Sequence, residues 1–388
     1  MQLFTPFDYL CIDVANTYGN DKDLYEDRIQ WTKDNLNQLE ELVGEADSPN
    51  MYWKAVDAVR CAQKGIPTGH LVGFDSASSG IQLLSTLARC KVGMRNTGVL
   101  NTTGMKSAPD IYKTCTQVMG RVSYVRKAVK SALMTFMYGS DMQPKITFGE
   151  GDDLELFFMA AKHVAPEAFD LRSILLGLAD PTRLDYTYTM PDRGVVHKRV
   201  WVKKDYRIQE PLLGSSFTFR TKVNEGKEDD KALAADVTHS IDSYVVREIN
   251  RRCNFNKEQL WQALAIINTL GDIEVTDRSK MMSLVEVEYL TVDTIGDYTL
   301  NQLAQLKEQI ETSLKYGSFE CVFIHDEFKC HANYMNILRK HYNIILWEMY
   351  HSNLLADIVK QISGLDLQVN EFDQQIADEI LDANYPIN

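Results

Sequence analysis

The stretch FECVFIHDEFKCHA, residues 319–332, is typical of a strand, a tight turn and a second strand, with His325 and Asp326 at the turn. A second apolar run, HLVGFD (residues 70–75), is typical of a buried strand and also ends in an acid, Asp75. Neither apolar setting suits an unpaired charge, so each aspartate is expected to have a partner. The chain therefore predicts a hairpin at 319–332 and a separate strand at 70–75, with one carboxylate at the turn and one at the strand end.

These two carboxylates suit a pair of metal ions. Taken singly, each is more simply interpreted as a turn or cap residue. Taken together, Asp75 and Asp326 can hold two Mg²⁺ ions about 4 Å apart, one activating a 3′-hydroxyl and one bracing a pyrophosphate. We therefore expect the two carboxylates to lie within about 4–6 Å of each other.

Between the two acids, VRKAVKSALMTFMYG (residues 125–139) is strongly helical. Arg126 and Lys130 lie one turn apart on one helix face, and Tyr138 follows further along. A cationic run is by default a solvated face, but this one leads into apolar residues. A guanidinium and an ammonium here can grip a triphosphate, and Lys130 can protonate a leaving pyrophosphate.

Composition places the chain among ordinary globular proteins. It has 388 residues, 45% of them apolar and 24% charged, which is enough for a large core and more than one substructure. Seven dispersed cysteines favour reduced thiols and argue against a zinc site. No apolar run is long enough to span a membrane, and the N-terminus lacks the features of a signal peptide. The net charge of -13 argues against nucleic-acid binding unless basic residues gather on one face.

The other segments are mostly helical, with one β-rich region. The expected helices cover residues 26–43, 78–90, 108–139 with a break near Gly120, 236–253, 295–316 and most of the chain from 334 onward. Residues 193–223 are expected to be β-rich, with a turn at Leu213 and Gly214.

Cations and aromatic side chains alternate in that β-rich region, and this mixture suits contact with a nucleic-acid backbone together with base stacking. The candidate cations are Lys203, Lys204, Arg207 and Arg220, and the aromatic residues are Trp201, Tyr206, Phe217 and Phe219. An ordinary amphipathic hairpin with a solvated basic face is the alternative.

With these motifs in order, the chain resembles the single-subunit RNA polymerases of the phage and mitochondrial type. The segment FDSASSGIQ (residues 74–82) is similar to the family's motif A, residues 125–139 to motif B, and His325-Asp326 to motif C. DVTHSIDS (residues 236–243) is similar to the segment with a ribose-contacting histidine, here His239.

The resemblance implies a right-hand α+β polymerase fold and roles for individual residues. It implies metal binding and catalysis for Asp75 and Asp326, and catalysis for Lys130, Tyr138 and His239. It further implies substrate contacts for Lys22, Gly80, Arg126, Gly139 and His325, and a nucleic-acid contact for Tyr112. The similarity is dense at the motifs and weak over 145–190 and 255–315. Ser76 and Ser131 depart from the family pattern, and the ending NYPIN does so too, which leaves no expected role for the terminal carboxylate.

Sugar choice separates RNA synthesis from DNA synthesis in this motif skeleton. Family A DNA polymerases carry a bulky acid five positions after the motif A aspartate, and here that position is Gly80. A glycine leaves room for a ribose 2′-hydroxyl, although a packing glycine at a helix start is the alternative. We therefore expect RNA synthesis, with Tyr138 and His239 on the ribose side.

The resemblance also implies a domain plan and partners. Residues 1–104 correspond to the first part of the palm, 105–239 to mostly helical fingers with a specificity hairpin at 205–222, and 240–388 to the rest of the palm and C-terminal helices. No counterpart of the thumb or the N-terminal domain is expected. The chain is thus similar to the larger subunit of the split, two-subunit members known from N-four-type podophages.

The expected partners are a second polymerase subunit supplying the N-terminal and thumb part, a DNA template, an RNA transcript and NTPs. The expected cofactor is a pair of Mg²⁺ ions, and the expected location is the cytoplasm of an infected bacterium. Need for a single-stranded-DNA-binding recruiter is left open, and no membrane partner is expected. Two alternatives remain, a family A-like DNA polymerase fragment and a non-catalytic polymerase-derived scaffold.

Overall fold

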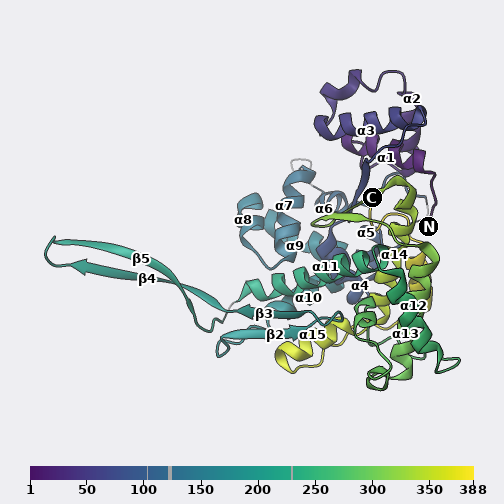
Figure 1. Ribbon diagram of the computed structural model, residues 1–388. Helices are drawn as coiled ribbons and strands as arrows, with labels where there is room; N and C mark the ends of the chain where they lie inside the picture. Colours follow the sequence, from purple (N-terminus) through teal and green to yellow (C-terminus); the bar gives the residue numbers. More distant parts are fainter. Residues whose placement is uncertain (103, 121–124, 229) are drawn as a thin grey trace.

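The computed structural model describes residues 1–102, 104–120, 125–228 and 230–388. Its centre is a three-stranded antiparallel sheet in the order β1-β7-β6, made of β1 (Leu71–Asp75), β6 (Cys321–Ile324) and β7 (Glu327–His331) (Figure 1). The register places Asp75 opposite Glu327. A two-residue turn, His325-Asp326, joins β6 to β7, and His325 adopts a left-handed φ of 57°. The hairpin expected from 319–332 is confirmed.

One face of this sheet is apolar because side chains alternate along each strand. Val72, Phe74, Phe328 and Cys330 are all buried. The ring of Phe74 stacks on Tyr25 at 5.7 Å between centroids, and Phe328 meets Tyr342 edge-on at 5.2 Å. This packing holds the strands, and therefore their acidic ends, in fixed register.

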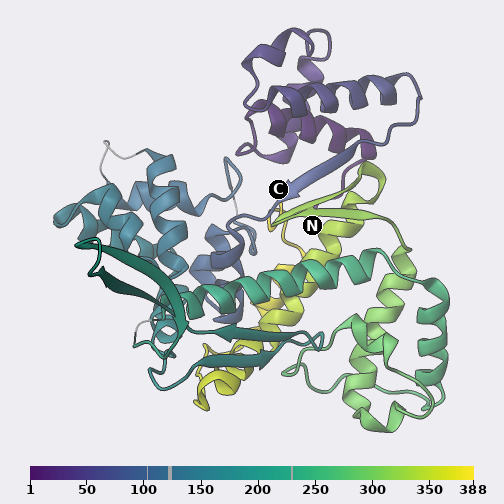
Figure 2. The same ribbon diagram turned by 60° about the vertical axis from the view of Figure 1, so that its left-hand side comes forward.

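Helices surround the sheet in three groups that follow the order of the chain (Figures 1 and 2). The first group is α1 (Pro6–Tyr18), α2 (Tyr25–Asp34), the 3₁₀ helix η1 (Glu41–Glu45) and α3 (Pro49–Gln63). The second is α4 (Ser79–Leu87), α5 (Lys91–Asn96), α6 (Ile111–Met119), α7 (Arg126–Met137), α8 (Met142–Phe148), α9 (Asp152–Val164) and α10 (Pro166–Leu176). The third is α11 (Lys231–Cys253), α12 (Lys257–Asn268), η2 (Leu284–Glu288), η3 (Ile295–Asp297), α13 (Leu300–Tyr316), η4 (Ala332–Tyr334), α14 (Met335–His351), α15 (Leu354–Ser363) and α16 (Gln374–Leu381).

Two antiparallel hairpins precede α11. The first pairs β2 (Asp185–Thr189) with β3 (Val195–Arg199), and the second pairs β4 (Trp201–Glu210) with β5 (Ser215–Asn224). The β4–β5 ribbon projects from the body as a long two-stranded arm (Figures 1 and 2). Gly214 closes its turn with a φ of 59°, a left-handed conformation that favours glycine. The expectation of a β-rich region with this turn is confirmed.

Residues 255–316 form a module with its own apolar core. Buried side chains of α12, η2 and α13, among them Leu264, Val287 and Leu306, pack together separately from the main core. The long helix α11 leads from the ribbon across the molecule to this module (Figure 2).

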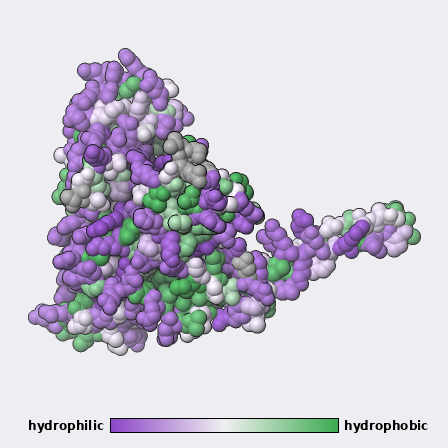
Figure 3. Space-filling view, turned by 180° about the vertical axis from the view of Figure 1, so that it is seen from behind, coloured by the Kyte–Doolittle hydropathy of each residue, from purple (hydrophilic) through white to green (hydrophobic). Residues whose placement is uncertain are grey.

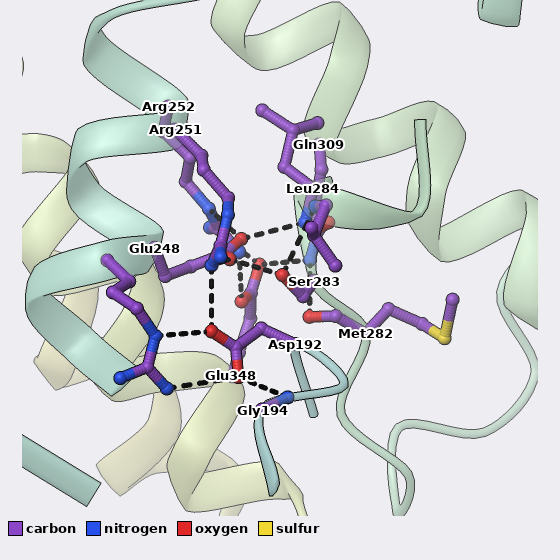
Figure 4. Close-up of polar contacts among 12 residues, drawn as sticks. Asp192, Gly194, Glu248, Arg251, Arg252, Met282, Ser283, Leu284, Gln309 and Glu348 are labelled. Carbon is purple, nitrogen blue, oxygen red and sulfur yellow. Dashed lines mark hydrogen bonds and ion pairs between the residues drawn. The ribbon is translucent and has the colours of Figure 1, made fainter. Parts of the chain in front are cut away.

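A buried network of ion pairs fastens α11 to the module and to α14 (Figure 4). Arg252 donates to Glu348 at 2.7 and 2.9 Å and to Glu248 at 3.0 Å. Glu248 also accepts from the Ser283 hydroxyl at 2.5 Å and from the Leu284 amide at 3.0 Å. Because each buried charge has a partner, this network can hold α11 without leaving an isolated ion.

The expected α+β class is confirmed, with differences at element ends. The helix expected over 26–43 ends at Asp34. The one over 295–316 starts only at Leu300, where Thr299 and Gln302 form a capping box. The break near Gly120 is present, since α6 ends there with a φ of 65°, while 121–124 lie outside the described residues. Among the described residues, no helix is both long and apolar enough to cross a membrane.

Candidate catalytic cleft

A cleft of about 950 Å³ opens beside the acidic end of the sheet. Its walls come from the loop before α2, the end of β1, the start of α4, α6, α7, α11 and the β6–β7 turn. The predicted residues that line it are Lys22, Asp75, Gly80, Tyr112, Arg126, Lys130, Tyr138, His239, His325 and Asp326. Segments far apart in sequence thus meet in one space.

Asp75 and Asp326 occupy one end of this cleft. The Ser76 amide donates to the Asp326 carbonyl at 3.1 Å, and the Ser76 hydroxyl donates to the Asp326 carboxylate at 3.4 Å. The walls of the cleft desolvate the Asp75 carboxylate, and the negative charges of Asp326 and Glu327 add to this, so the pKa of Asp75 rises to about 6. Lys22 and Lys130 act in the opposite direction.

This electrostatic setting fits divalent cations. Adjacent carboxylates with no cationic side chain bonded to Asp75 in the described part of the chain form a hard oxygen donor set. A bound cation would relieve the repulsion that raises the pKa of Asp75. The predicted separation of about 4–6 Å between the carboxylates stays a prediction.

A further acid, Asp242, lines the same cleft and was not predicted. It lies on α11, three residues after His239 and therefore on the same helix face. Burial raises the pKa of Asp242 to about 6, with a further contribution from Asp326, while His325 opposes the shift. The spacing of His239 and Asp242 within DVTHSIDS was the signal that could have identified it.

Arg126 and Lys130 both lie over the ring of Tyr112. The Arg126 guanidinium carbon is 5.6 Å from the ring centroid and the Lys130 Nζ is 5.7 Å from it. Arg126 also bonds to Asp110, which caps α6. Both cations therefore line the cleft as predicted, but Arg126 already has an acidic partner.

Tyr112 itself is an internal support rather than an open contact surface. It is only 7% exposed, and its hydroxyl donates to the Ser78 hydroxyl at 2.8 Å. The tyrosine ring lies beneath two cations and lines the cleft, and its nucleic-acid contact stays a prediction.

The space left by Gly80 is filled by Tyr138. A Cβ atom at Gly80 would lie 2.6 Å from the Tyr138 Oη and 3.3 Å from the Thr238 methyl group. The Tyr138 ring also faces His239, with 4.8 Å between centroids. Burial raises the pKa of Tyr138 to about 12, so its hydroxyl keeps its proton at neutral pH. Gly80 is thus needed by Tyr138, a role that differs from the open space expected from sequence.

Gly139 lies apart from the cleft lining. Its φ is 98°, and a Cβ there would meet the Leu176 side chain at 3.1 Å and the Lys231 carbonyl at 3.2 Å. The glycine allows α7 to turn and pack against α10 and α11. The predicted substrate contact of Gly139 stays a prediction.

The last residues of the chain reach the site, which sequence reasoning did not predict. Asn388 lines the cleft, its amide donates to the Asp75 carbonyl at 2.9 Å, and the Asp75 amide donates to the Asn388 carbonyl at 3.2 Å. The Ala77 amide donates to the Pro386 carbonyl at 3.2 Å. Residues 386–388 therefore extend the sheet beside Asp75, and NYPIN carries no motif that signals this.

No protein-family model and no curated protein sequence matches this chain. The function therefore has to be argued from the cleft. Its lining is polar and holds charges of both signs, with the carboxylates of Asp75 and Asp326 and the cations of Lys22, Arg126 and Lys130. Lys22 and Lys130 are close enough to oppose the rise in the pKa of Asp75. Such a site can bind a metal–polyphosphate and transfer a phosphoryl or nucleotidyl group.

The predicted nucleic-acid cations lie away from the cleft, on the β4–β5 ribbon. Arg220 pairs with Asp205 at 2.8 Å, and Lys204 pairs with Glu225. Arg207 bonds the Ser216 hydroxyl at 3.0 Å. Two of the four predicted cations thus have acidic partners, so they contribute less positive charge than the sequence indicates.

The strand register separates the ribbon into two faces. Tyr206 pairs with Phe219 and Ile208 with Phe217 on one face, while Lys203 pairs with Lys222 on the other. The aromatic face is exposed, and hydrophobic residues reach the tip of the arm (Figure 3). An exposed aromatic face backed by cations is the arrangement expected for stacking on bases.

Proposed function

We propose that this chain is the catalytic part of a DNA-directed RNA polymerase that transfers nucleotides from NTPs to an RNA 3′-end. The observation that carries the proposal is the cleft whose lining brings Asp75 and Asp326 together with Lys22, Arg126 and Lys130. The sequence motifs that resemble the phage and mitochondrial family supply these same residues. In this proposal the β1-β7-β6 sheet is the core of the palm, and α6–α10 belong to the fingers.

The residues would divide the work as follows. Asp75 and Asp326 would hold two Mg²⁺ ions, which when bound supply activation of the 3′-hydroxyl and neutralisation of the pyrophosphate charge. Lys22 and Arg126 would bind triphosphate oxygens. Lys130 would donate a proton to the pyrophosphate oxygen as the bond between it and the α-phosphorus breaks.

Sugar selection would come from Tyr138 and His239. The protonated Tyr138 hydroxyl beside Gly80 can donate a hydrogen bond toward a ribose, and His239 holds the other side of the ring. A larger acidic side chain at Gly80, as in family A DNA polymerases, would collide with this tyrosine. This observation favours RNA synthesis over the DNA polymerase alternative.

Primer extension tests the proposal. In the presence of the second subunit proposed below, a fluorescent RNA primer annealed to single-stranded DNA should be extended with NTPs and Mg²⁺, and Asp75→Asn or Asp326→Asn should each remove at least about 99% of extension. Asp366→Asn, which changes an acid paired with Lys360 at the surface, serves as the control. If Asp75→Asn and Asp326→Asn extend the primer as well as Asp366→Asn does, the metal assignment and the proposal that rests on it are rejected.

A second subunit is part of the same proposal. The chain carries a net charge of -13, which opposes binding to DNA and RNA, so a partner with a basic surface would complete the grip on the hybrid. We expect an interface above about 2,000 Å² in total, as in permanent complexes. The second subunit is supported if this chain copurifies with the product of a neighbouring reading frame and if primer extension requires that product. Processive transcription by the isolated chain would contradict the proposal of a second subunit.

A further inference from the structure

Arg28 on α2 has a fully buried guanidinium that bonds to four other residues. Its Nε donates to the Asp23 carbonyl at 2.9 Å and its Nη2 to the Asp21 carbonyl at 2.8 Å. Its Nη1 donates to the Asn16 side chain at 2.9 Å, and Nη2 also reaches the Asn388 side-chain oxygen at 3.4 Å. All three nitrogens of the planar guanidinium thus donate hydrogen bonds.

These acceptors are neutral, and this makes the burial of Arg28 costly. Within the described residues Arg28 has no ion pair, a property it shares with the buried Arg339, whereas the buried Arg172 and Arg252 pair with Asp141 and Glu348. The face of the Tyr25 ring, 4.9 Å from the guanidinium carbon, gives partial compensation. A buried cation without a carboxylate needs a reason beyond stability.

The guanidinium contacts two segments that line the cleft, the turn around Lys22 and the segment at Asn388. Asp21 and Asp23 flank Lys22, so the bonds to their carbonyls fix the turn that carries this lysine. Asn388 is paired with Asp75 through both backbone hydrogen bonds. One guanidinium therefore connects the backbone around Lys22 to the segment that supports Asp75.

We propose that Arg28 is a positioning residue that fixes Lys22 relative to Asp75. The inference rests on the proposed function, in which Lys22 binds the triphosphate and Asp75 binds the cation that the same triphosphate contacts. Arg28 touches neither substrate nor cation and acts through the turn 21–23 and through residue 388. A lysine at this position keeps the charge but cannot reach both ends, because it lacks the fork.

The test compares Arg28→Lys with Arg60→Lys. Arg60 makes a comparable fork, to the Leu36 carbonyl at 2.6 Å and to Glu40 at 2.7 Å, but lies outside the cleft lining. For each variant we would measure melting temperature, hydrogen exchange of peptides covering 20–24 and 386–388, and the Kd of a fluorescent NTP.

We expect Arg28→Lys to increase hydrogen exchange in both peptides and to raise the Kd of the fluorescent NTP by about tenfold. The reason is that fewer positioned hydrogen bonds then hold the turn that carries Lys22. Arg60→Lys should lower the melting temperature less, because its pair with Glu40 is partly exposed, and should leave both readouts unchanged. In a double-mutant cycle, Lys22→Ala should remove most of the effect of Arg28→Lys on the Kd. If Arg28→Lys does not fold, Asn388→Ala should increase exchange in 386–388 and leave 20–24 protected.

Other outcomes separate the two proposals. Unchanged exchange in both peptides, or a Kd effect that adds fully to that of Lys22→Ala, would overturn the role of Arg28 while leaving the polymerase proposal standing. If the wild-type protein binds no NTP at all, the proposed function fails. The positioning role then fails as well, even if Arg28→Lys increases hydrogen exchange in both peptides.

Discussion

At the residue scale, Gly80 and Tyr138 show how a missing side chain becomes part of a site. The absent Cβ of Gly80 makes room for the tyrosine hydroxyl, which would otherwise be 2.6 Å from that atom. Contacts this short force a shift of the neighbour, and here the neighbour is also held by His239. The two positions are therefore coupled, and substitutions at either should alter the other.

We predict that Gly80→Ala reduces extension with NTPs by at least about tenfold, because displaced Tyr138 can no longer orient the ribose. Tyr138→Phe should instead keep the rate and lower the ratio of NTP to dNTP use, because only the hydroxyl is lost. Single-nucleotide extension with matched NTP and dNTP measures both effects. An unchanged NTP/dNTP ratio in Tyr138→Phe would argue against the sugar assignment.

His341 is a second residue whose chemistry follows from its surroundings. It lies on α14, fully buried, and in the described structure neither ring nitrogen has a hydrogen-bond partner. The ring packs edge-on against Tyr316 at 5.6 Å between centroids. Burial, together with the charges of Arg252 and Lys340, lowers the pKa of His341 to about 3 from its ordinary 6.5.

A lowered pKa in the folded state makes the protein less stable in acid. His341 is neutral in both states above pH 6.5, so its cost appears only as the pH falls below 6.5, where the unfolded chain takes up the proton first. Between pH 6.5 and 5 the loss is about 2 kcal/mol. His341→Phe should reduce this acid sensitivity in urea denaturation at pH 5 and 7, and the exposed His163→Gln should not. Identical pH slopes for the wild type and His341→Phe would contradict the assignment.

At the element scale, the β4–β5 ribbon is the part of the fold least supported by the body. A two-stranded ribbon is marginally stable in water by itself, and this one leaves Tyr206, Phe217 and Phe219 exposed. Lys203, Arg207 and Lys222 have no acidic partner within the described chain, whereas Lys204 and Arg220 are neutralised. The element thus suits an anionic, aromatic ligand better than a role in folding.

We predict that replacing residues 203–222 with Asn-Gly preserves the fold, because Val202 and Val223 are directly paired and a two-residue turn can join them. The melting temperature should change by less than about 2 °C, since the arm adds little to the core. The slope of log affinity for single-stranded DNA against log salt should fall by about two to three. A variant that changes Lys203, Arg207 and Lys222 to Gln is the matched control, and it should show the same reduced slope as the deletion. An unchanged slope in both would remove the ribbon from the binding surface.

At the scale of the whole molecule, the buried network around Arg252 joins parts that have separate apolar cores. Arg252 on α11 is 2% exposed and lies between Glu248 and Glu348, while Asp192 before β3 accepts from Arg247 and Arg251 at 2.6 and 3.0 Å (Figure 4). Burial raises the pKa of Glu348, although Arg252 opposes this. Buried ion pairs and charged hydrogen bonds therefore connect the long helix α11, which lines the cleft, to the module of residues 255–316 and to α14.

We predict that Glu348→Gln destabilises the protein by about 3–5 kcal/mol, because it breaks the buried two-bond ion pair with Arg252 and leaves Glu248 as its only carboxylate partner in the described structure. Glu308→Gln removes a surface pair with Arg278 and should cost less than about 1 kcal/mol. Chemical denaturation followed by tryptophan fluorescence measures both, and a second transition in Glu348→Gln would show that the module has uncoupled. Equal stability of the two variants would mean that the network is not structural.

Local sequence determined much of this molecule. The strand–turn–strand of 319–332, the strand ending at Asp75, the cationic helix and the turn at Gly214 could each be predicted because short-range patterning and glycine conformation decide them. The candidate acids and cations were identified for the same reason, since motif spacing places them on defined faces or strand ends. The α+β class followed from these elements together.

Only the tertiary structure decided how those elements complete one another. Asp242 faces Asp326, Tyr138 fills the space at Gly80, and Arg28 reaches Asn388 across 360 residues of sequence. None of these relations has a local signal, because each depends on where distant backbones come to rest when the apolar faces are buried. Burial also altered the chemistry, since it raised the pKa of Asp75, and strand pairing on the exposed ribbon brought Arg220 beside Asp205. The sequence supplies the reactive groups, and packing in a low-dielectric interior decides which of them meet and in what charge state.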